Sequence, residues 1–259
     1  MQGTIAKTFL YPIKGMQGVE MTTKGLMTDP KLGIYGDRNH AIYRRPNNPP
    51  TEWAPKGKFL VCMNHEGMAT PIGSGLNEHD LDDDHELDSE WVWEMFRGRR
   101  MIPVDDCSLV HTRGAYHLAD TNKPCVSFLN LASVRWLEQH TGLHIDPRRF
   151  RMNVWVDGLE PWAELDFITA FEQGEQFPMQ VNEQTFLCDD ICERCRAIEQ
   201  NPETGKWDMK LQDIISAALT DYGYTGSPHR QKMAVMGWLA IPTTHELLRA
   251  GDSVTLGNN

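Results

Sequence analysis

The sequence contains no apolar run that approaches the length of a membrane-spanning helix, which needs about 20 such residues. Its opening, Met-Gln-Gly-Thr-Ile-Ala-Lys, lacks the extended apolar segment of a secretory leader. Basic residues are in the minority, with 25 Lys and Arg against 36 Asp and Glu and a formal net charge of -11. A negative field opposes binding to nucleic acid or anionic lipid. We therefore expect a cytoplasmic protein with no nucleic-acid partner and no membrane partner.

Cysteine is too sparse for a disulfide-stabilised secreted scaffold, because six residues are spread over 259 positions. We expect these thiols to be reduced. Hydrophobic residues make up 40% and charged residues 24% of the chain, which is typical of globular proteins. A chain of this length is long for one compact core, so two domains are the starting expectation.

Short strands and turns dominate the first hundred residues. β-prone apolar runs span Thr4 to Ile13 and Asn39 to Arg44, and a proline-rich loop follows over Arg45 to Pro55. A short helix is predicted over Trp91 to Arg99. We place a domain boundary near residue 100, with a β-barrel-like N-terminal domain over 1–100 and a second domain over 101–259.

The second half mixes strands with amphipathic helices. Apolar spacing predicts helices over Ser127 to His140 and Leu211 to Leu219. Strands are predicted over Phe150 to Val156, Met179 to Leu187, Ala234 to Ile241 and Ser253 to Leu256. Many short strands and few helices indicate an α+β fold that is mostly β, with β-barrel cores and peripheral helices.

Half of the cysteines, Cys188, Cys192 and Cys195, fall within eight consecutive positions. Their C-x3-C-x2-C spacing matches the iron-sulfur motif of radical S-adenosylmethionine enzymes, but only 64 of the 259 residues follow Cys195, and Arg194 replaces the usual aromatic residue. A structural zinc site needs four ligands, and the second C-x-x-C pair is missing. A thioredoxin-like dithiol would need a helix N-terminus after a strand, which the surrounding pattern supports weakly.

A single metal thiolate is the third interpretation of this cluster. Arg194 and Arg196 flank Cys195, and adjacent cations favour the ionised thiol that binds a soft metal. Cys192 has Glu193 and Arg194 as neighbours, so its local charge is more nearly balanced. Local charge therefore favours Cys195 as a metal ligand, and a buried unreactive cysteine is the alternative.

A series of short motifs follows a fixed order along nearly the whole chain. The motifs are Tyr11-Pro12-Ile13-Lys14 with Gly18, Gly36-Asp37-Arg38, Ser127-Phe128-Leu129-Asn130-Leu131-Ala132-Ser133, Arg149-Phe150-Arg151-Met152-Asn153, Trp162-Ala163-Glu164, Cys192-Glu193-Arg194-Cys195 with Pro202-Glu203-Thr204-Gly205, and Gly251-Asp252-Ser253-Val254. This order resembles that of the MOSC family with its N-terminal β-barrel domain. Met152 stands where that family commonly has proline, which leaves details of the substrate pocket open.

The resemblance implies a molybdenum-molybdopterin cofactor whose metal is bound by Cys195. It also assigns cofactor contacts to Lys14, Arg38, Asp120, Thr121, Asn122, Arg151 and Asn153. The chemistry agrees, because Arg donates bidentate hydrogen bonds to a phosphate and Lys offers a point charge. The three residues from Asp120 to Asn122 are expected to supply backbone amides and side chains near the ligand.

The resemblance further implies an oxidoreductase with Cys195 at its catalytic centre, acting on N-hydroxylated substrates of the N-hydroxylaminopurine or amidoxime type. The chain lacks the C-x4-C-x2-C pattern of a ferredoxin domain, so a separate electron-donor protein of ferredoxin, flavin reductase or cytochrome type is expected. Two alternatives are a non-catalytic carrier of the cofactor or of sulfur, and an interaction module that has lost the cofactor. His40, His117 and His229 are candidate proton donors by position alone.

Overall fold

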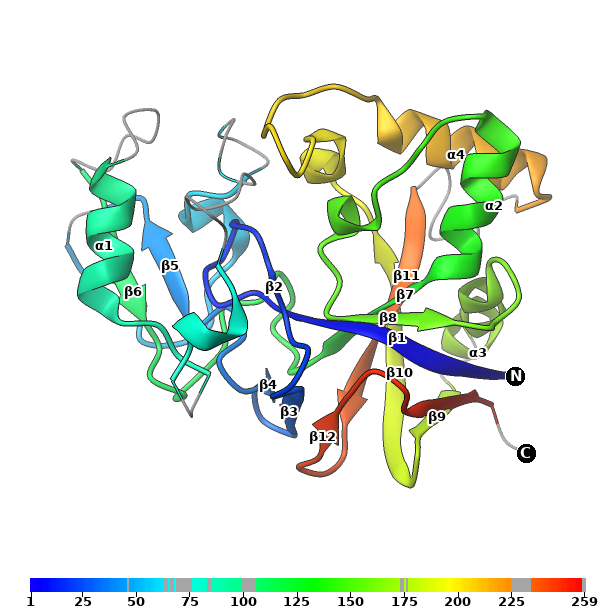
Figure 1. Ribbon diagram of the computed structural model, residues 1–259, viewed down its shortest axis with the longest axis horizontal. Coiled ribbons are helices and arrows are strands. Elements are labelled where there is room, and N and C mark those ends of the chain that lie inside the picture. The colour runs from blue at the N-terminus through cyan, green and yellow to red at the C-terminus, as the bar shows by residue number, and fades with distance from the viewer. Residues whose placement is uncertain are drawn as a thin grey trace.

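The computed structural model describes residues 1–45, 47–62, 65, 68, 76–82, 85–98, 106–172, 175, 177–224 and 234–257. Its largest unit is a closed barrel of seven strands in the order β13, β9, β10, β11, β7, β8 and β1, closed by pairing of β13 with β1 (Figure 1). The strands are β1 (Gln2–Leu10), β7 (Val126–Asn130), β8 (Val154–Asp157), β9 (Phe177–Val181), β10 (Gln184–Glu193), β11 (Val235–Pro242) and β13 (Ser253–Leu256). The fold is α+β and mostly β, as predicted.

Peripheral helices cover the outside of this barrel. Two of them, α2 (Leu131–Thr141) and α4 (Leu211–Asp221), lie side by side at one end, and α3 (Phe167–Glu172) contacts β10 and β9 (Figure 1). Helix α2 begins directly after β7, because the Asn130 side chain accepts a hydrogen bond from the Ala132 N–H, and it ends at Gly142 in the left-handed region. Three short 3-10 helices lie between the strands of the barrel in the sequence: η3 (Pro147–Phe150), η4 (Ala163–Asp166) and η5 (Arg196–Glu199).

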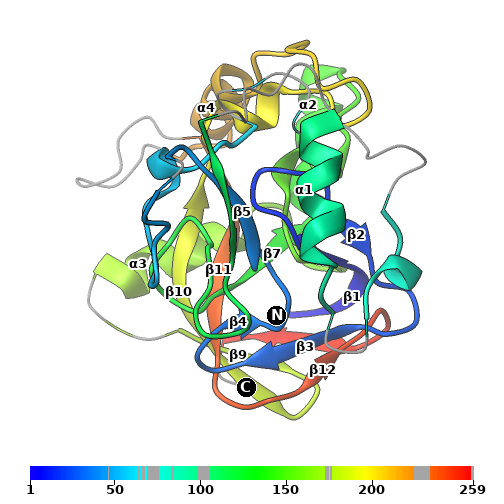
Figure 2. The ribbon, with the colours of Figure 1, turned by 90° about the vertical axis from the view of Figure 1, so that its left-hand side faces the viewer.

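A smaller β unit lies against the barrel. Strands β5 (His40–Tyr43) and β6 (Ser108–His111) form an antiparallel ribbon beside α1 (Ser89–Gly98) (Figure 2). A second small sheet joins β3 (Leu26–Asp29) to β4 (Gly33–Ile34) and β12 (Leu247–Leu248), and β2 (Val19–Glu20) pairs with β1. The first part of the chain also contains the 3-10 helices η1 (Lys56–Lys58) and η2 (Glu78–Asp80). One hydrophobic cluster runs from Phe96 in α1 to Trp238 in β11, so the two units share a core.

The first strand bears on the predicted domain division. Strand β1 comes from the first ten residues, yet it pairs with β8 and β13 of the barrel. The predicted boundary near residue 100 falls among residues 99–105, which lie outside the described residues. The division at 100 therefore stays a prediction, and any division of the structure leaves β1 with the barrel.

Several predicted elements need correction at their boundaries. The helix predicted over Ser127 to His140 begins at Leu131, because Val126–Asn130 is a fully buried strand between β11 and β8. The strand predicted over Met179 to Leu187 is a hairpin of β9 and β10, with Asn182 in the left-handed region at its turn. The other helices and closing strands agree with prediction within a few residues. No helix among the described residues is long and apolar enough to cross a membrane.

Candidate functional site

A cavity of about 360 Å³ opens between the barrel and the smaller unit. Its floor comes from three neighbouring barrel strands, because Leu239 of β11 pairs with Ser127 of β7 on one side and with Asp190 of β10 on the other. Its walls come from the segments that hold Lys14, Arg38 and Lys56, from the loop of Ala119 to Thr121, from Arg151 to Asn153, and from Cys192 to Cys195. The cavity therefore gathers residues from both halves of the sequence.

Lys14 is the most deeply buried cation of the site, with 2% of its side chain exposed. Its ammonium donates hydrogen bonds to the Leu118 carbonyl at 2.7 Å and to Asp120 Oδ1 at 2.5 Å. Burial lowers the pKa of Lys14, and the ion pair with Asp120 opposes that effect. Burial alone would raise the pKa of Asp120, but the Lys14 ammonium holds it well below its usual range. The pair fixes the Asp120 loop against the cavity wall.

Arg38 and Arg151 enclose the Tyr11 ring. Their guanidinium carbons lie 5.1 Å and 5.0 Å from the ring centroid, and both residues adopt left-handed backbone conformations, with φ of 51° and 54°. Burial raises the pKa of Tyr11 to about 12, so the phenol stays neutral between the two cations. The Arg38 guanidinium is also paired with Asp37. No hydrogen bond or ion pair joins the Arg151 guanidinium to the part of the chain that the structure describes.

Asp37 links the parts of the site that carry these cations, and the sequence analysis missed it. Its Oδ1 accepts hydrogen bonds from the Tyr11 backbone N–H and from Asn153 Nδ2, both at 2.9 Å, while Oδ2 pairs with Arg38. The second Asn153 amide hydrogen is donated to the Phe9 carbonyl at 3.1 Å. Both donors of this amide are therefore used within the protein, which favours a supporting role for Asn153. The position of Asp37 within Gly36-Asp37-Arg38 was the available sequence signal.

The Asn153 amide also fixes the floor of the cavity. Its Oδ1 accepts a hydrogen bond from Ser127 Oγ at 2.6 Å, and the Asn153 backbone N–H donates to the same hydroxyl at 3.0 Å. Ser127 is buried at the start of the strand row that forms the floor. The predicted contact residue Thr121 lines the cavity, whereas Asn122 is exposed and lies outside its lining.

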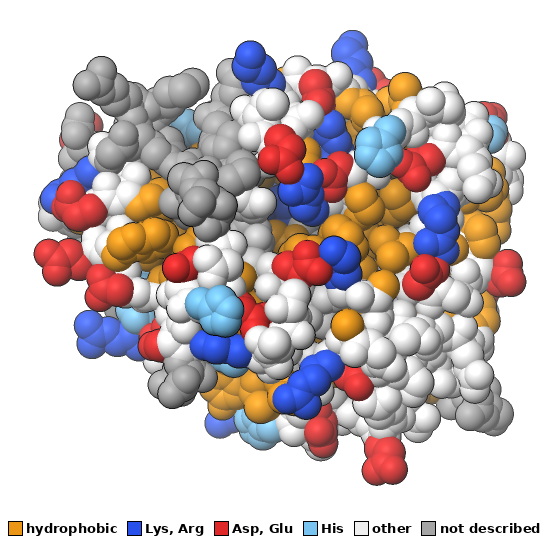
Figure 3. Space-filling model, in the orientation of Figure 1, with side chains coloured by type: hydrophobic (Ala, Val, Ile, Leu, Met, Phe, Trp, Pro, Cys, Tyr) orange, Lys and Arg blue, Asp and Glu red, His pale blue; other side chains and the backbone are white. Residues whose placement is uncertain are grey.

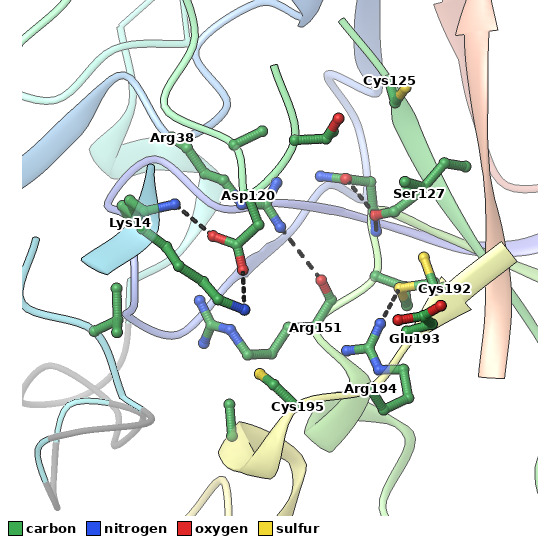
Figure 4. Close-up of a pocket in the computed structure, with 18 of the residues that line it drawn as sticks. Lys14, Arg38, Asp120, Cys125, Ser127, Arg151, Cys192, Glu193, Arg194 and Cys195 are labelled. Carbon is green, nitrogen blue, oxygen red and sulfur yellow. Dashed lines mark hydrogen bonds and ion pairs between the residues drawn. The ribbon is translucent and has the colours of Figure 1, made fainter. Parts of the chain in front are cut away.

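The cysteines of the cluster differ in their surroundings. Cys192 lies inside β10 in the hydrophobic core, and burial raises its pKa to about 11. Cys195 follows the end of that strand, caps η5 and lines the cavity with its side chain half-buried. Cys188 is buried in the barrel, with its pKa raised to about 12 by burial. Of the three, Cys195 is the thiol whose surroundings suit a ligand of the cavity (Figure 4).

The charge argument that first selected Cys195 is wrong in detail. The Arg194 guanidinium donates to the Phe150 carbonyl and contacts Met152 Sδ at 3.3 Å, and it approaches Cys192 (Figure 4). Arg196 pairs with Glu199 and lies 4.7 Å from the Trp207 ring, outside the cavity lining. Of the two flanking arginines, Arg194 alone lines the cavity, and the other cations of the lining, Lys14, Arg38, Lys56 and Arg151, come from distant parts of the sequence.

Neither His40 nor His117, the two candidate histidines within the described residues, lines the cavity. His40 lies under α1, stacked on His111 with ring centroids 4.1 Å apart, and burial lowers its pKa to about 3. His117 is buried, and burial lowers its pKa as well. His229 lies outside the described residues. Acidic and basic side chains are interspersed over the face shown in Figure 3.

Comparison with known proteins gives one family match. The family model of the MOSC domain matches residues 114–255, which is more than half of the chain. No curated protein matches the sequence. The crystal structure of the YuaD protein from Bacillus subtilis is similar at 12% identity and a TM-score of 0.45, covering 100% of this chain and 98% of that one, a likeness too distant to bear on function.

Proposed function

The chain belongs to the MOSC domain family, and from that premise we propose that it binds a molybdenum-molybdopterin cofactor in this cavity and reduces N-hydroxylated compounds. The observation that carries the proposal is the Arg151 guanidinium, which lines the cavity and has no acceptor within the part of the chain that the structure describes. A half-buried cation of this kind favours an anionic ligand, because an unpaired charge away from water is costly.

The donor set fits the cofactor at both of its ends. A phosphate tail would be held by Arg38, Arg151 and Lys14, two planar forks and one point charge. A molybdenum ion would be held by the Cys195 thiolate, since soft thiolates suit that class of metal. When bound, the cofactor supplies two-electron redox chemistry. The residues of this chain would bind its tail through Lys14, Arg38 and Arg151 and would hold its metal at Cys195, over a floor in which the Ser127 hydroxyl and the Asn153 amide are hydrogen-bonded to each other.

The overall reaction needs two electrons and two protons, which convert an N–OH group into N–H and one molecule of water. We propose that the electrons come from a separate donor protein of ferredoxin, flavin reductase or cytochrome type. A carrier of the cofactor or of sulfur is the second candidate, because Cys62, Cys125, Cys192 and Cys195 all line the cavity and thiols can hold a transferable sulfur. A carrier binds its cargo without turnover.

Metal analysis of matched cysteine variants tests the proposal. The protein is produced in a host that makes the cofactor, and molybdenum and oxidised-pterin fluorescence are measured for wild type, Cys195→Ala and Cys192→Ala. We expect near-stoichiometric molybdenum in wild type and Cys192→Ala and loss of most of it in Cys195→Ala. Equal metal content in both variants would contradict the assignment of Cys195. Turnover of an amidoxime with an artificial donor then separates the enzyme from the carrier.

A further inference from the structure

A second, smaller cavity of about 170 Å³ adjoins the candidate site, and the proposed function makes no use of it. Arg151 and Ala197 line both cavities. Most of the remaining described lining comes from the end of β1, from the segment that leads into β2, and from η3 and η5 with the residues that follow them. Since one water molecule occupies about 30 Å³, the cavity has room for about five or six waters or for one small compound.

Three residues that line this second cavity each contain a buried polar atom with no hydrogen-bond partner in the part of the chain that the structure describes. The atoms are Gln17 Oε1, Arg149 Nε and Gln200 Oε1. Buried polar atoms in native proteins are nearly always hydrogen-bonded, either within the protein or to an ordered water or ligand. Two acceptors and one donor around one small cavity therefore point to something that the cavity binds.

Gln200 is held in one orientation, with only 1% of the residue exposed. Its Nε2 donates hydrogen bonds to the Cys62 carbonyl at 2.5 Å and to the His65 carbonyl at 3.4 Å. Because a carbonyl can only accept, these two contacts fix which end of the amide is the nitrogen and leave Oε1 as the unsatisfied acceptor. Cys62 lines the cofactor cavity, so Gln200 links the two cavities.

Arg149 has one N–H donor to spare, although its charge is already neutralised. Only 6% of the residue is exposed. Its Nη2 donates to Asp208 at 2.9 Å and its Nη1 to the Ile198 carbonyl at 3.4 Å, which leaves Nε without an acceptor in the described residues. The remaining donor therefore suits an uncharged acceptor such as a carbonyl oxygen.

The other charges of the second cavity are compensated as well. Arg148 is paired with Asp146 and with Glu203, each at 2.6 Å, and Glu20 is paired with a lysine of β1 at 2.9 Å. Arg151 is the exception, and it also borders the cofactor cavity, where we propose that a phosphate binds it. A cavity whose charges are paired favours an uncharged ligand, because an ion would have to give up its hydration without gaining a counter-charge.

We propose that this second cavity binds a planar, uncharged ring with an amide-type edge, on which N–H donors stand beside a carbonyl acceptor. Gln17 and Gln200 would accept from the N–H groups, and Arg149 would donate to the carbonyl. Pterin rings and purine-type bases both carry such an edge, so the ring could belong to the cofactor or to a free base. Binding of the ring goes beyond the proposed function, and only its assignment to the cofactor rests on that function.

Ligand titration followed by NMR tests the inference with two bicyclic compounds. Lumazine has N–H donors beside carbonyls, whereas quinoxaline has the same bicyclic frame with neither group. The full-length chain is prepared without cofactor as wild type, Gln17→Met and the control Gln139→Met, which changes an exposed glutamine of α2 outside the cavity lining. We expect wild type to prefer lumazine. Gln17→Met should bind lumazine about fivefold more weakly, with quinoxaline unchanged, and Gln139→Met should behave as wild type.

Equal effects of the two substitutions would overturn the inference. So would equal binding, or no binding, of the two compounds to wild type, because ordered water would then account for the three atoms. The comparison on wild type decides the matter even if Gln17→Met does not fold.

The same titration on protein from a host that makes the cofactor identifies the source of the ring. If the loaded protein no longer binds lumazine, the ring of the cofactor occupies the second cavity; if it binds lumazine as before, the cavity takes a free base. Molybdenum content is measured on the same preparations. A chain that never contains molybdenum but binds lumazine through Gln17 would refute the proposed function alone. A chain that loads molybdenum but does not bind lumazine in its cofactor-free form would refute this inference alone.

Discussion

Replacement of Asp37 by alanine tests whether one buried carboxylate holds the site together. The change leaves the Tyr11 backbone N–H and an Asn153 amide hydrogen without their acceptor, and it leaves Arg38 without its ion-pair partner. An unsatisfied buried donor costs about 1 to 3 kcal/mol, and breaking a buried ion pair costs about 3 to 5 kcal/mol. Because Arg38 keeps 16% of its side chain exposed, water recovers part of the second cost. We expect a net loss of about 3 to 5 kcal/mol.

Urea unfolding followed by tryptophan fluorescence measures this loss, with Glu94→Ala as the control. Glu94 forms an ion pair with Arg97 in which both side chains are more than half exposed, so its removal should cost no more than about 0.5 kcal/mol. Thermal unfolding of Asp37→Ala should begin roughly 10 °C below that of wild type. Similar midpoints and slopes for Asp37→Ala and Glu94→Ala would refute the idea that Asp37 organises the site.

Three further predictions follow from other parts of the molecule. Burial lowers the pKa of His40 to about 3, against an ordinary value of 6.5, so as the pH falls below 6.5 His40 is protonated in the unfolded chain but not in the folded one. The free energy of unfolding should therefore drop by about 2 kcal/mol between pH 7 and pH 5. His40→Gln should reduce that drop. Gly237→Ala should lower the free energy of unfolding in urea by about 3 kcal/mol or more, because the new Cβ would lie 2.3 Å from a backbone oxygen of β7. The control Gly251→Ala meets no atom within 4 Å, so it should cost only about 1 to 2 kcal/mol of conformational strain. Arg151→Met should weaken pyrophosphate binding about tenfold in calorimetry while Arg196→Met leaves it unchanged, and equal effects would place the anion elsewhere.

Sequence periodicity predicted the helices more accurately than the strands. The helix over Leu211–Asp221 could be predicted because its buried positions, such as Ile215 and Leu219, repeat at helical spacing. The helix predicted from Ser127 onward included most of strand Val126–Asn130, because a short apolar run has no period that distinguishes a buried strand from a buried helix. Its strand conformation comes from pairing with β8 and β11, which are distant in the sequence. Such long-range pairing cannot be read from local composition.

Site residues that belong to the recognised motifs could be predicted from the sequence. Residues whose role depends on contacts with distant parts of the chain were missed. Arg151 lies more than a hundred positions after Lys14 and Arg38, and the family resemblance alone connected the three before the structure placed them around one cavity. Asp37 was missed because acidic side chains are common on an acidic protein, and nothing local separates a buried carboxylate from a solvated one. Its partners Tyr11 and Asn153 come from other parts of the chain, so only the folded chain identifies it.

The choice between Cys192 and Cys195 shows why the end of a strand matters more than the charge of adjacent residues. Arg194 and Arg196 flank Cys195 in the sequence, yet Arg194 turns toward the Phe150 carbonyl and Arg196 toward Trp207. Pairing of β10 with β11 continues to Glu193, which keeps Cys192 inside the barrel wall, where burial raises its pKa to about 11. Two residues later the pairing has ended, and the chain turns into η5 at the cavity. Both thiols line the cavity, but Cys192 is buried within the strand whereas Cys195, beyond the end of the ladder, is half-buried, which is why we propose Cys195 as the metal ligand.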